Sequence, residues 1–218
     1  MVRIHPSLLA ADLTHLREAI LMAEEAGASA IQIDVMDGHF VPNLTFGPKM
    51  VEDIRKQTSL PLEVHLMVYE PIKWIEPFYK AGANSLIAHY EATPHLDKFI
   101  QQCQDLDLIC GVALNPATDI AVVEKLVKNI NILLLMGVNP GFHGQPMVPH
   151  LPEKVKKSKA WFKDINPRLL IEVDGGVNET TAPTLIQEGA DILILGASFY
   201  LNPKRREFVK HLYQLSST

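Results

Sequence analysis

The sequence is poor in three features that would each point to a class of protein: paired cysteines, an excess of basic residues and long apolar runs. Its two cysteines, Cys103 and Cys110, lack the CxxC spacing of a zinc or redox pair, so we expect buried thiols in a reducing cytosol. The formal charge of -5 argues against nucleic acid or an acidic membrane as partner and leaves a small molecule. No long apolar run follows Arg3, so we expect a cytoplasmic protein without signal peptide or membrane span.

What the chain does have is a repeating pattern. With 218 residues, 47% of them hydrophobic, it can bury one sizeable core, and we expect residues 1–218 to form a single catalytic domain. Short apolar, β-rich runs alternate with amphipathic stretches, which is typical of parallel strands joined by crossover helices. Eight runs predict strands at 4–9, 30–35, 62–67, 85–90, 108–114, 131–136, 169–173 and 191–195, each followed by a helical stretch.

Glycines mark where the predicted helices end. The first helix is expected to begin at Asp12 as N-cap and to end before Gly27, with Leu13, Leu16, Ile20 and Ala23 at helical spacing on its packed face. Gly82 and Gly189 punctuate two later helices in the same way, one turn before the next strand. Similar helix-to-strand joints indicate a repeated βα unit.

Eight such units favour an α/β fold, specifically a single-domain TIM (β/α)8 barrel. The two longest loops, 36–48 and 137–149, follow the second and sixth strands and so lie at the carboxyl ends of strands, where barrel enzymes keep their active sites. The alternation also permits a doubly wound open sheet, but no GxGxxG follows the first strand.

Polar side chains recur at every second position of three predicted strands. Because successive side chains point to opposite faces of a strand, these residues share the face that points into the barrel. The inward pairs are Gln32 and Asp34, Glu63 and His65, and Glu172 and Asp174.

Asp34 and Asp174 are expected to face each other across the barrel mouth. Two carboxylates on opposite sides of a substrate can remove a carbon-bound proton from one face and return one to the other, which inverts a stereocentre. His65 between them completes a plausible divalent-metal site. The alternative is a buried ionic network without chemistry, which the convergence of three strand ends disfavours.

Glycine-rich turns after the late strands predict a phosphate site. They lie at 139–145, 174–176 and 196–198. Glycine lets backbone N–H groups approach an anion closely, and loops after the last strands of a barrel commonly bind phosphate. The sequence therefore predicts an acid–base enzyme for a small sugar phosphate.

Several segments resemble the signatures of ribulose-phosphate 3-epimerases. They are IDVMDGHFVPN at 33–43, VHLM at 64–67, VNPGF at 138–142 and VDGG at 173–176, and the likeness extends from 6–9 to 196–198. The resemblance implies an isomerase of the pentose phosphate pathway that interconverts D-ribulose 5-phosphate and D-xylulose 5-phosphate on a TIM barrel. It also implies a divalent metal (Zn, Fe, Mn or Co) and a homo-oligomer, either a dimer or a hexamer.

By position, the resemblance assigns Asp34 and Asp174 as the catalytic acid and base, and both, with His65, as metal ligands. The chemistry implied is removal of the C3 proton next to a carbonyl, which gives an enediolate that a metal can stabilise. The methionines implied to line the cavity could instead be simple core packing at strand ends. The substrate-binding residues implied are Ser7, His65, Met36, Met67, Met136, Gly141, Phe142, His143, Gly144, Gly175, Gly176, Gly196 and Ala197.

Three positions depart from the family pattern. Gln32 stands where the family normally has a histidine metal ligand. Either a metal still binds, with Gln32 or water completing a weaker site, or the metal is lost and the Gln32 amide donates a hydrogen bond to the enediolate.

Gly137 and His143 stand where the family more often has a hydroxyl residue and a glycine. A 3-epimerase of another ketose phosphate, such as D-allulose 6-phosphate, is therefore the alternative enzyme. A catalytically weakened sugar-phosphate-binding barrel is the alternative of another class, which the retained Asp34 and Asp174 disfavour because a binder has no need of carboxylates beside a phosphate.

Overall fold

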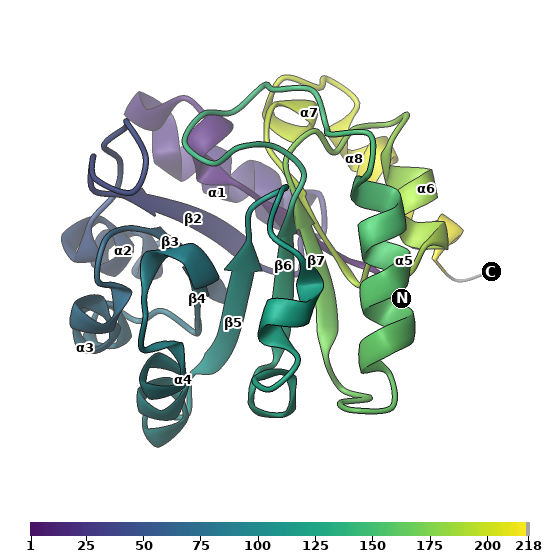
Figure 1. Cartoon of the computed structure of the whole chain (residues 1–218). Coiled ribbons are helices and arrows are strands. Elements are labelled where there is room, and N and C mark those ends of the chain that lie inside the picture. Colours follow the sequence, from purple (N-terminus) through teal and green to yellow (C-terminus); the bar gives the residue numbers. More distant parts are fainter. Residues whose placement is uncertain (217–218) are drawn as a thin grey trace.

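The computed structural model describes residues 1–216, and its core is one sheet of eight parallel strands (Figure 1). The hydrogen-bonded order is β1-β8-β7-β6-β5-β4-β3-β2. One parallel bridge between Ser7 and Gln32 joins the two ends of this order, so the sheet curls into a nearly closed barrel and the barrel prediction is confirmed. The strands are β1 Arg3–Pro6, β2 Ile31–Met36, β3 Leu62–Met67, β4 Ser85–His89, β5 Ile109–Leu114, β6 Ile132–Met136, β7 Leu170–Asp174 and β8 Ile192–Leu195.

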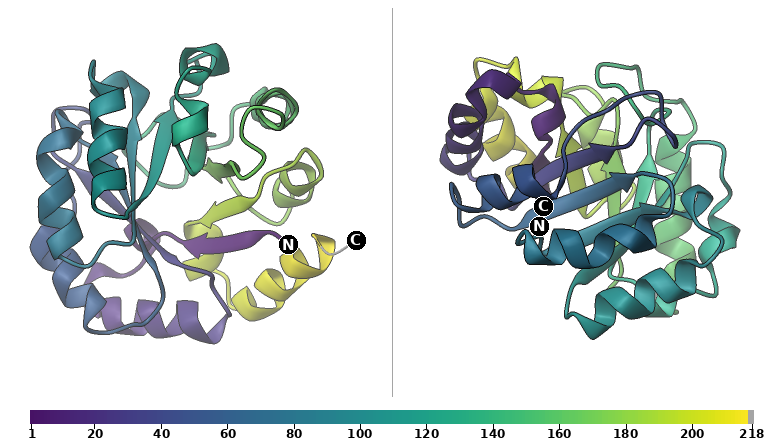
Figure 2. Two further views of the ribbon diagram at one scale, coloured as in Figure 1. Left: turned by 90° about the horizontal axis from the view of Figure 1, so that it is seen from below. Right: turned by 90° about the vertical axis from the view of Figure 1, so that its left-hand side faces the viewer.

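Helices form an outer ring around the strands (Figure 2). The main apolar core fills the layer between this ring and the sheet, with Phe78, Phe99, Phe162 and Phe199 fully buried. Both cysteines are free and buried, as predicted. The α-helices are α1 Leu16–Glu25, α2 Pro48–Arg55, α3 Ile75–Lys80, α4 Leu96–Asp105, α5 Leu151–Phe162, α6 Ala182–Gln187, α7 Ala197–Tyr200 and α8 Arg205–Leu215.

Two predicted boundaries differ at the N-terminus. The first strand ends at Pro6 instead of residue 9, because a 3₁₀ helix follows at Leu8–Ala10. Asp12 does accept a hydrogen bond from the backbone N–H of Thr14 (2.9 Å), but it caps a 3₁₀ turn at Leu13–His15 that precedes α1. Leu13 is consequently about half exposed and does not join the packed face.

The connection after β5 is the other exception, since it contains no α-helix. Two 3₁₀ helices occupy it, Ile120–Val123 and Val127–Asn129. The β-branched pair Val122 and Val123 disfavours an α-helix here, and the side chain of Asp119 holds the first turn by accepting from the N–H of Ala121.

The interior of the barrel is divided by polarity. Apolar side chains from β4, β5, β6 and β8 form one cluster, which includes Ile87, Leu134 and Ile194. The inward pairs that the alternation predicted on β2, β3 and β7 are buried, except for Asp174, which is partly exposed, and His5 on β1 is a further buried polar residue. Polar side chains therefore gather on the side of the barrel interior that β1, β2, β3 and β7 form.

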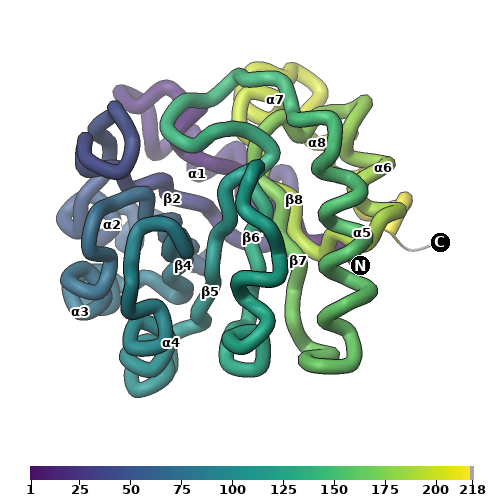
Figure 3. The backbone as a smooth tube through the Cα atoms, viewed as in Figure 1, coloured from purple at the N-terminus to yellow at the C-terminus, as the bar shows by residue number. Residues whose placement is uncertain are grey.

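The two longest loops lie over the carboxyl ends of the strands (Figure 3). The loop after β2 and the loop after β6 are tied together by Asn43, whose amide Nδ2 donates to the carbonyl of Gly141 (2.8 Å). Within the part of the chain that the structure describes, no helix has both the length and the apolar character needed to cross a membrane.

Candidate active site

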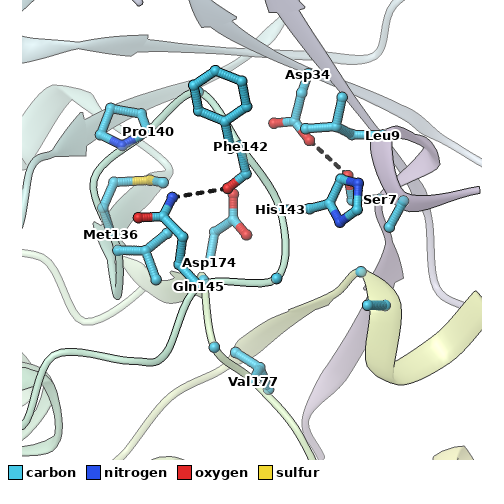
Figure 4. Close-up of a pocket in the computed structure, with 18 of the residues that line it drawn as sticks. Ser7, Leu9, Asp34, Met136, Pro140, Phe142, His143, Gln145, Asp174 and Val177 are labelled. Atoms are coloured by element: carbon cyan, nitrogen blue, oxygen red, sulfur yellow. Dashed lines mark hydrogen bonds between the residues drawn. The ribbon is translucent and has the colours of Figure 1, made fainter. Parts of the chain in front are cut away.

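A cavity of about 320 Å³ opens at the carboxyl ends of the strands, beneath these loops (Figure 4). Asp34 and Asp174 both line it. Every residue predicted to bind substrate lines it too, except His65, which lies fully buried behind them. The predicted residues in its wall are Ser7, Met36, Met67, Met136, Gly141, Phe142, His143, Gly144, Gly175, Gly176, Gly196 and Ala197.

Asp34 is held rigidly at the end of β2. The hydroxyl of Ser7 donates to its Oδ2 (2.6 Å), and His65 Nδ1 lies 2.9 Å from its Oδ1. Thr45 fixes the backbone below, since its hydroxyl donates to the Asp34 carbonyl and accepts from the N–H of Met36. The carboxylate therefore presents a defined face to the cavity.

Asp174 ends β7 on the other side of His65. Its Oδ2 lies 3.8 Å from His65 Nδ1 and accepts from the amide Nε2 of Gln32 (3.4 Å). Burial and the charge of Asp34 raise its pKa to about 7, against the opposing influence of His65 and Gln32. A carboxyl group that titrates near neutral pH can both accept and release a proton under ordinary conditions.

His65 is backed by a residue that sequence reasoning missed. His89, at the end of β4, places its Nε2 2.9 Å from His65 Nε2, and its Nδ1 lies 3.3 Å from Glu91 Oε2. Burial lowers the pKa of His89 to about 4, whereas the hydrogen bond and charge of Asp34 outweigh burial and raise the pKa of His65. The alternation Ser85, Ile87, His89 could have revealed this inward imidazole.

Asp34, His65 and Asp174 have the geometry of a metal-binding group. One donor atom from each lies within 4.8 Å of the others, and all three residues are buried or nearly so. Imidazole with carboxylates suits zinc, iron or manganese. Gln32 lies beside this group, since its Nε2 donates to Asp174, and its buried Oε1 has no hydrogen-bond partner. The donor set therefore fits a divalent metal.

Glycines shape the opposite wall of the cavity. Gly176 has φ +71°, and a Cβ there would lie 2.6 Å from the backbone nitrogen of Met147. Gly137 packs closely against the turn at Gly175: an added Cβ would lie 2.3 Å from the carbonyl oxygen of Gly175, so a side chain here would require this turn to shift. Gln145, the last residue of the predicted phosphate turn 139–145, braces the loop by donating to the carbonyls of Asn139 and Phe142.

The barrel and its mouth define a TIM-barrel enzyme of the acid–base type, with a glycine-lined place for an anionic small molecule. The relatives agree. Residues 3–200 match the ribulose-phosphate 3 epimerase family, and the chain belongs to this family.

Named relatives match over nearly their whole length. The ribulose-phosphate 3-epimerase of Bacillus subtilis is 45% identical over 213 residues, which cover 97% of this chain and 98% of that protein. The ribulose-phosphate 3-epimerase of Chlamydia muridarum is 41% identical over 201 residues, covering 91% and 88%. Among solved structures, tryptophan synthase of Mycobacterium tuberculosis superposes with a TM-score of 0.70 at 16% identity, over all of this chain and 93% of that one, which is a likeness of fold.

Proposed function

We propose that this chain interconverts D-ribulose 5-phosphate and D-xylulose 5-phosphate, acting as a single catalytic domain over residues 1–218. The observation that carries the proposal is the placement of Asp34 and Asp174. Both line the cavity, from strands on either side of β1 and β8, and both approach His65. The identity of the substrate is inferred from membership of the ribulose-phosphate 3-epimerase family.

The reaction needs one carboxylate as base and one carboxyl group as acid. The base takes the proton from C3, the C–H electron pair forms a C2–C3 double bond, and the C2 carbonyl oxygen becomes the enediolate oxygen. The acid then gives a proton to C3 on the opposite face while the carbonyl reforms. The two aspartates exchange roles when the reaction runs backwards.

The remaining cavity residues orient the substrate for this exchange. Ser7, whose hydroxyl is already bonded to Asp34, lies where it can contact a substrate hydroxyl. The backbone N–H groups of the glycine turns receive the phosphate, and Met36, Met67 and Met136 provide an apolar wall that excludes water. Fixing both ends of the ketose leaves C3 between the carboxylates.

Asp34, His65 and Asp174 are the residues that would hold a divalent metal, with the Oε1 of Gln32 as the fourth donor. When bound, the metal supplies charge that stabilises the enediolate oxygen. We favour the ligand role of Gln32 over a direct hydrogen bond to the enediolate because its Nε2 already points to Asp174 while its Oε1 is unsatisfied. Metal analysis of protein purified without chelator, with activity assayed before and after chelation, tests this assignment.

The decisive test of the activity is proton exchange at C3. Ribulose 5-phosphate incubated with the enzyme in D₂O should gain deuterium at C3 and yield xylulose 5-phosphate, both observed by ¹H NMR. Heat-inactivated enzyme is the control. Absence of exchange at high enzyme concentration would sink the proposal. The cytoplasmic location and the dimeric or hexameric state stay predictions, the second being open to light scattering.

A further inference from the structure

A second group of ligating side chains lies inside the barrel, below the mouth. Glu63 on β3 and Glu172 on β7 precede the mouth residues His65 and Asp174 by two positions in their strands, and His5 on β1 precedes Ser7, which lies just beyond the end of that strand. The three side chains therefore point to the same inward side as the mouth residues, roughly 6–7 Å away along each strand. Their donor atoms lie within 4.8 Å of one another, as do those of the mouth group.

These three side chains are deeply buried. His5 is 5% exposed, Glu63 2% and Glu172 0%. His5 Nδ1 lies 3.1 Å from Glu63 Oε1, so the Glu63 carboxylate has a hydrogen-bond partner. The other has no such partner: among the residues that the structure describes, no N–H or hydroxyl group donates to either oxygen of Glu172.

A buried carboxylate without donors is costly, because an ionised group taken out of water must be neutralised or paired. A carboxylate oxygen of Glu63 lies within 4.8 Å of one of Glu172, so a second carboxylate adds repulsion at this position. Two carboxylates and one imidazole need either a shared proton or a cation between them.

We propose that His5, Glu63 and Glu172 form a second, internal site for a divalent transition-metal ion. One imidazole nitrogen with two carboxylate oxygens is a donor set that zinc or cobalt accepts. Such an ion neutralises both carboxylates and satisfies the oxygens of Glu172. It also cross-links three strands, β1, β3 and β7, through the barrel interior, so its role is structural.

This site is distinct from the mouth site, although one residue borders both. Gln32 is the strand partner of Glu63 in the β2–β3 register, and its amide donates to Asp174 of the mouth group. The internal group lines no part of the substrate cavity. The proposal therefore stands or falls independently of the catalytic one.

Cobalt stoichiometry tests the proposal. Because the group is closed off from solvent, the full chain is refolded in the presence of Co²⁺, freed of excess metal by gel filtration and analysed by ICP-MS and visible absorption. Three proteins are compared: wild type, Asp34→Asn/Asp174→Asn, which disables the mouth group, and the same double variant with Glu172→Gln. Circular dichroism confirms that each is folded.

We expect the double variant to retain about one cobalt per chain, with the d–d absorption of a low-symmetry site, and Glu172→Gln to remove it. A double variant that binds no cobalt, or a triple variant that binds as much as the double, would overturn the proposal and leave a shared proton as the neutralising group. Should Glu172→Gln fail to fold, His5→Gln in the same background gives the same readout, with loss of the cobalt expected and its retention contradictory.

Discussion

Gln32 stands where the resemblance to the epimerases implies a histidine, and its contacts indicate its role. It is fully buried, its Nε2 is engaged by Asp174, and its Oε1 has no donor. A buried acceptor left unsatisfied costs about 1–3 kcal/mol, so this oxygen is available to a cation at the mouth.

Replacing Gln32 by histidine should therefore tighten metal binding. Imidazole is a stronger ligand than a neutral amide for zinc or iron, and we expect a gain of at least the roughly 10–100-fold that even outer ligand partners contribute. Competition against a chromophoric chelator measures it. Gln32→Ala is the control and should bind more weakly than wild type; equal affinity in all three proteins would remove Gln32 from the ligand set.

Asp174→Asn should abolish turnover without loss of the fold. The amide keeps the shape of the side chain but can neither take nor deliver the C3 proton, and positioned acid–base groups contribute about 10²–10⁴-fold to rate. A coupled assay of kcat with urea unfolding alongside checks both halves. Asp164→Asn, the same change at an exposed aspartate, is the control and should be fully active. Wild-type kcat in Asp174→Asn would contradict the role.

For single residues, the alternation of side chains along a strand was enough to predict which residues of β2, β3 and β7 point into the barrel. The sequence did not predict which of these side chains contact one another. The contact of His65 with His89 depends on the register between β3 and β4, and the free oxygen of Gln32 depends on which way its amide turns in a packed interior. Neither is encoded locally.

Glycines Gly27 and Gly189 illustrate, at the scale of elements, two different reasons for a glycine after a helix. Both have positive φ, +79° and +105°. An added Cβ at Gly27 would meet no atom within 4 Å, whereas at Gly189 it would lie 2.9 Å from Cγ of Lys159, whose ammonium pairs with Asp191. A substitution at Gly27 therefore tests backbone strain alone, whereas one at Gly189 adds a steric clash with Lys159.

Gly27→Ala should lower the free energy of unfolding by about 1 kcal/mol, the strain of a left-handed alanine. Gly189→Ala should lower it further, by a total of roughly 2 kcal/mol or more, because Lys159 must move. Urea denaturation of both variants measures the difference. The ranking would be wrong if Gly27→Ala were the more damaging change.

Glu91 connects the ends of β4 and β5. Burial raises its pKa, but hydrogen bonds with His89, Thr118 and the N–H of Asn115 outweigh burial and lower the pKa to about 2. The ionised form is thus favoured by folding. Its stabilisation is fully present above the unfolded pKa near 4.5 and is lost as the pH falls from there towards 2.

Glu91→Gln should therefore lower the free energy of unfolding by about 1 kcal/mol at pH 7; the value is modest because solvent screens a side chain that is partly exposed. The difference in free energy of unfolding between variant and wild type should decrease as the pH falls from 5 to 3. Urea unfolding across that range follows it, with Glu124→Gln, at an exposed glutamate, as the control. A gap that does not change with pH would exclude the ionised carboxylate as the cause.

Most elements followed from local patterns, since buried parallel strands are short apolar runs and helices between them are amphipathic. The prediction of a helix after β5 was wrong because the apolar residues of this segment are mostly β-branched, which lowers the propensity for an α-helix. The prediction that the first strand extends to residue 9 was wrong because apolar residues also form the 3₁₀ turn at Leu8–Ala10, and apolarity alone does not distinguish the two.

For the whole molecule, ligand binding should be visible as stability. A ligand at 100 times its Kd adds about 2.7 kcal/mol to the folded state, which for a chain of this size is a rise in Tm of roughly 5–10 °C. Ribulose 5-phosphate added to the inactive Asp174→Asn protein should give this shift without turnover. Ribulose without phosphate should give much less; equal shifts would mean that the glycine turns do not bind the phosphate.

The pairing of β1 with β8 has a consequence for how the enzyme is made. Ser7 is synthesised about 190 residues before Gly196 and Ala197, which line the same cavity. Until β8 arrives, β1 has an open edge and the pocket lacks a side, so the nascent chain is exposed to aggregation and unable to grip a sugar phosphate. Catalytic competence is thus acquired only when β8 has been synthesised, and chains released before that contain both aspartates but no working enzyme.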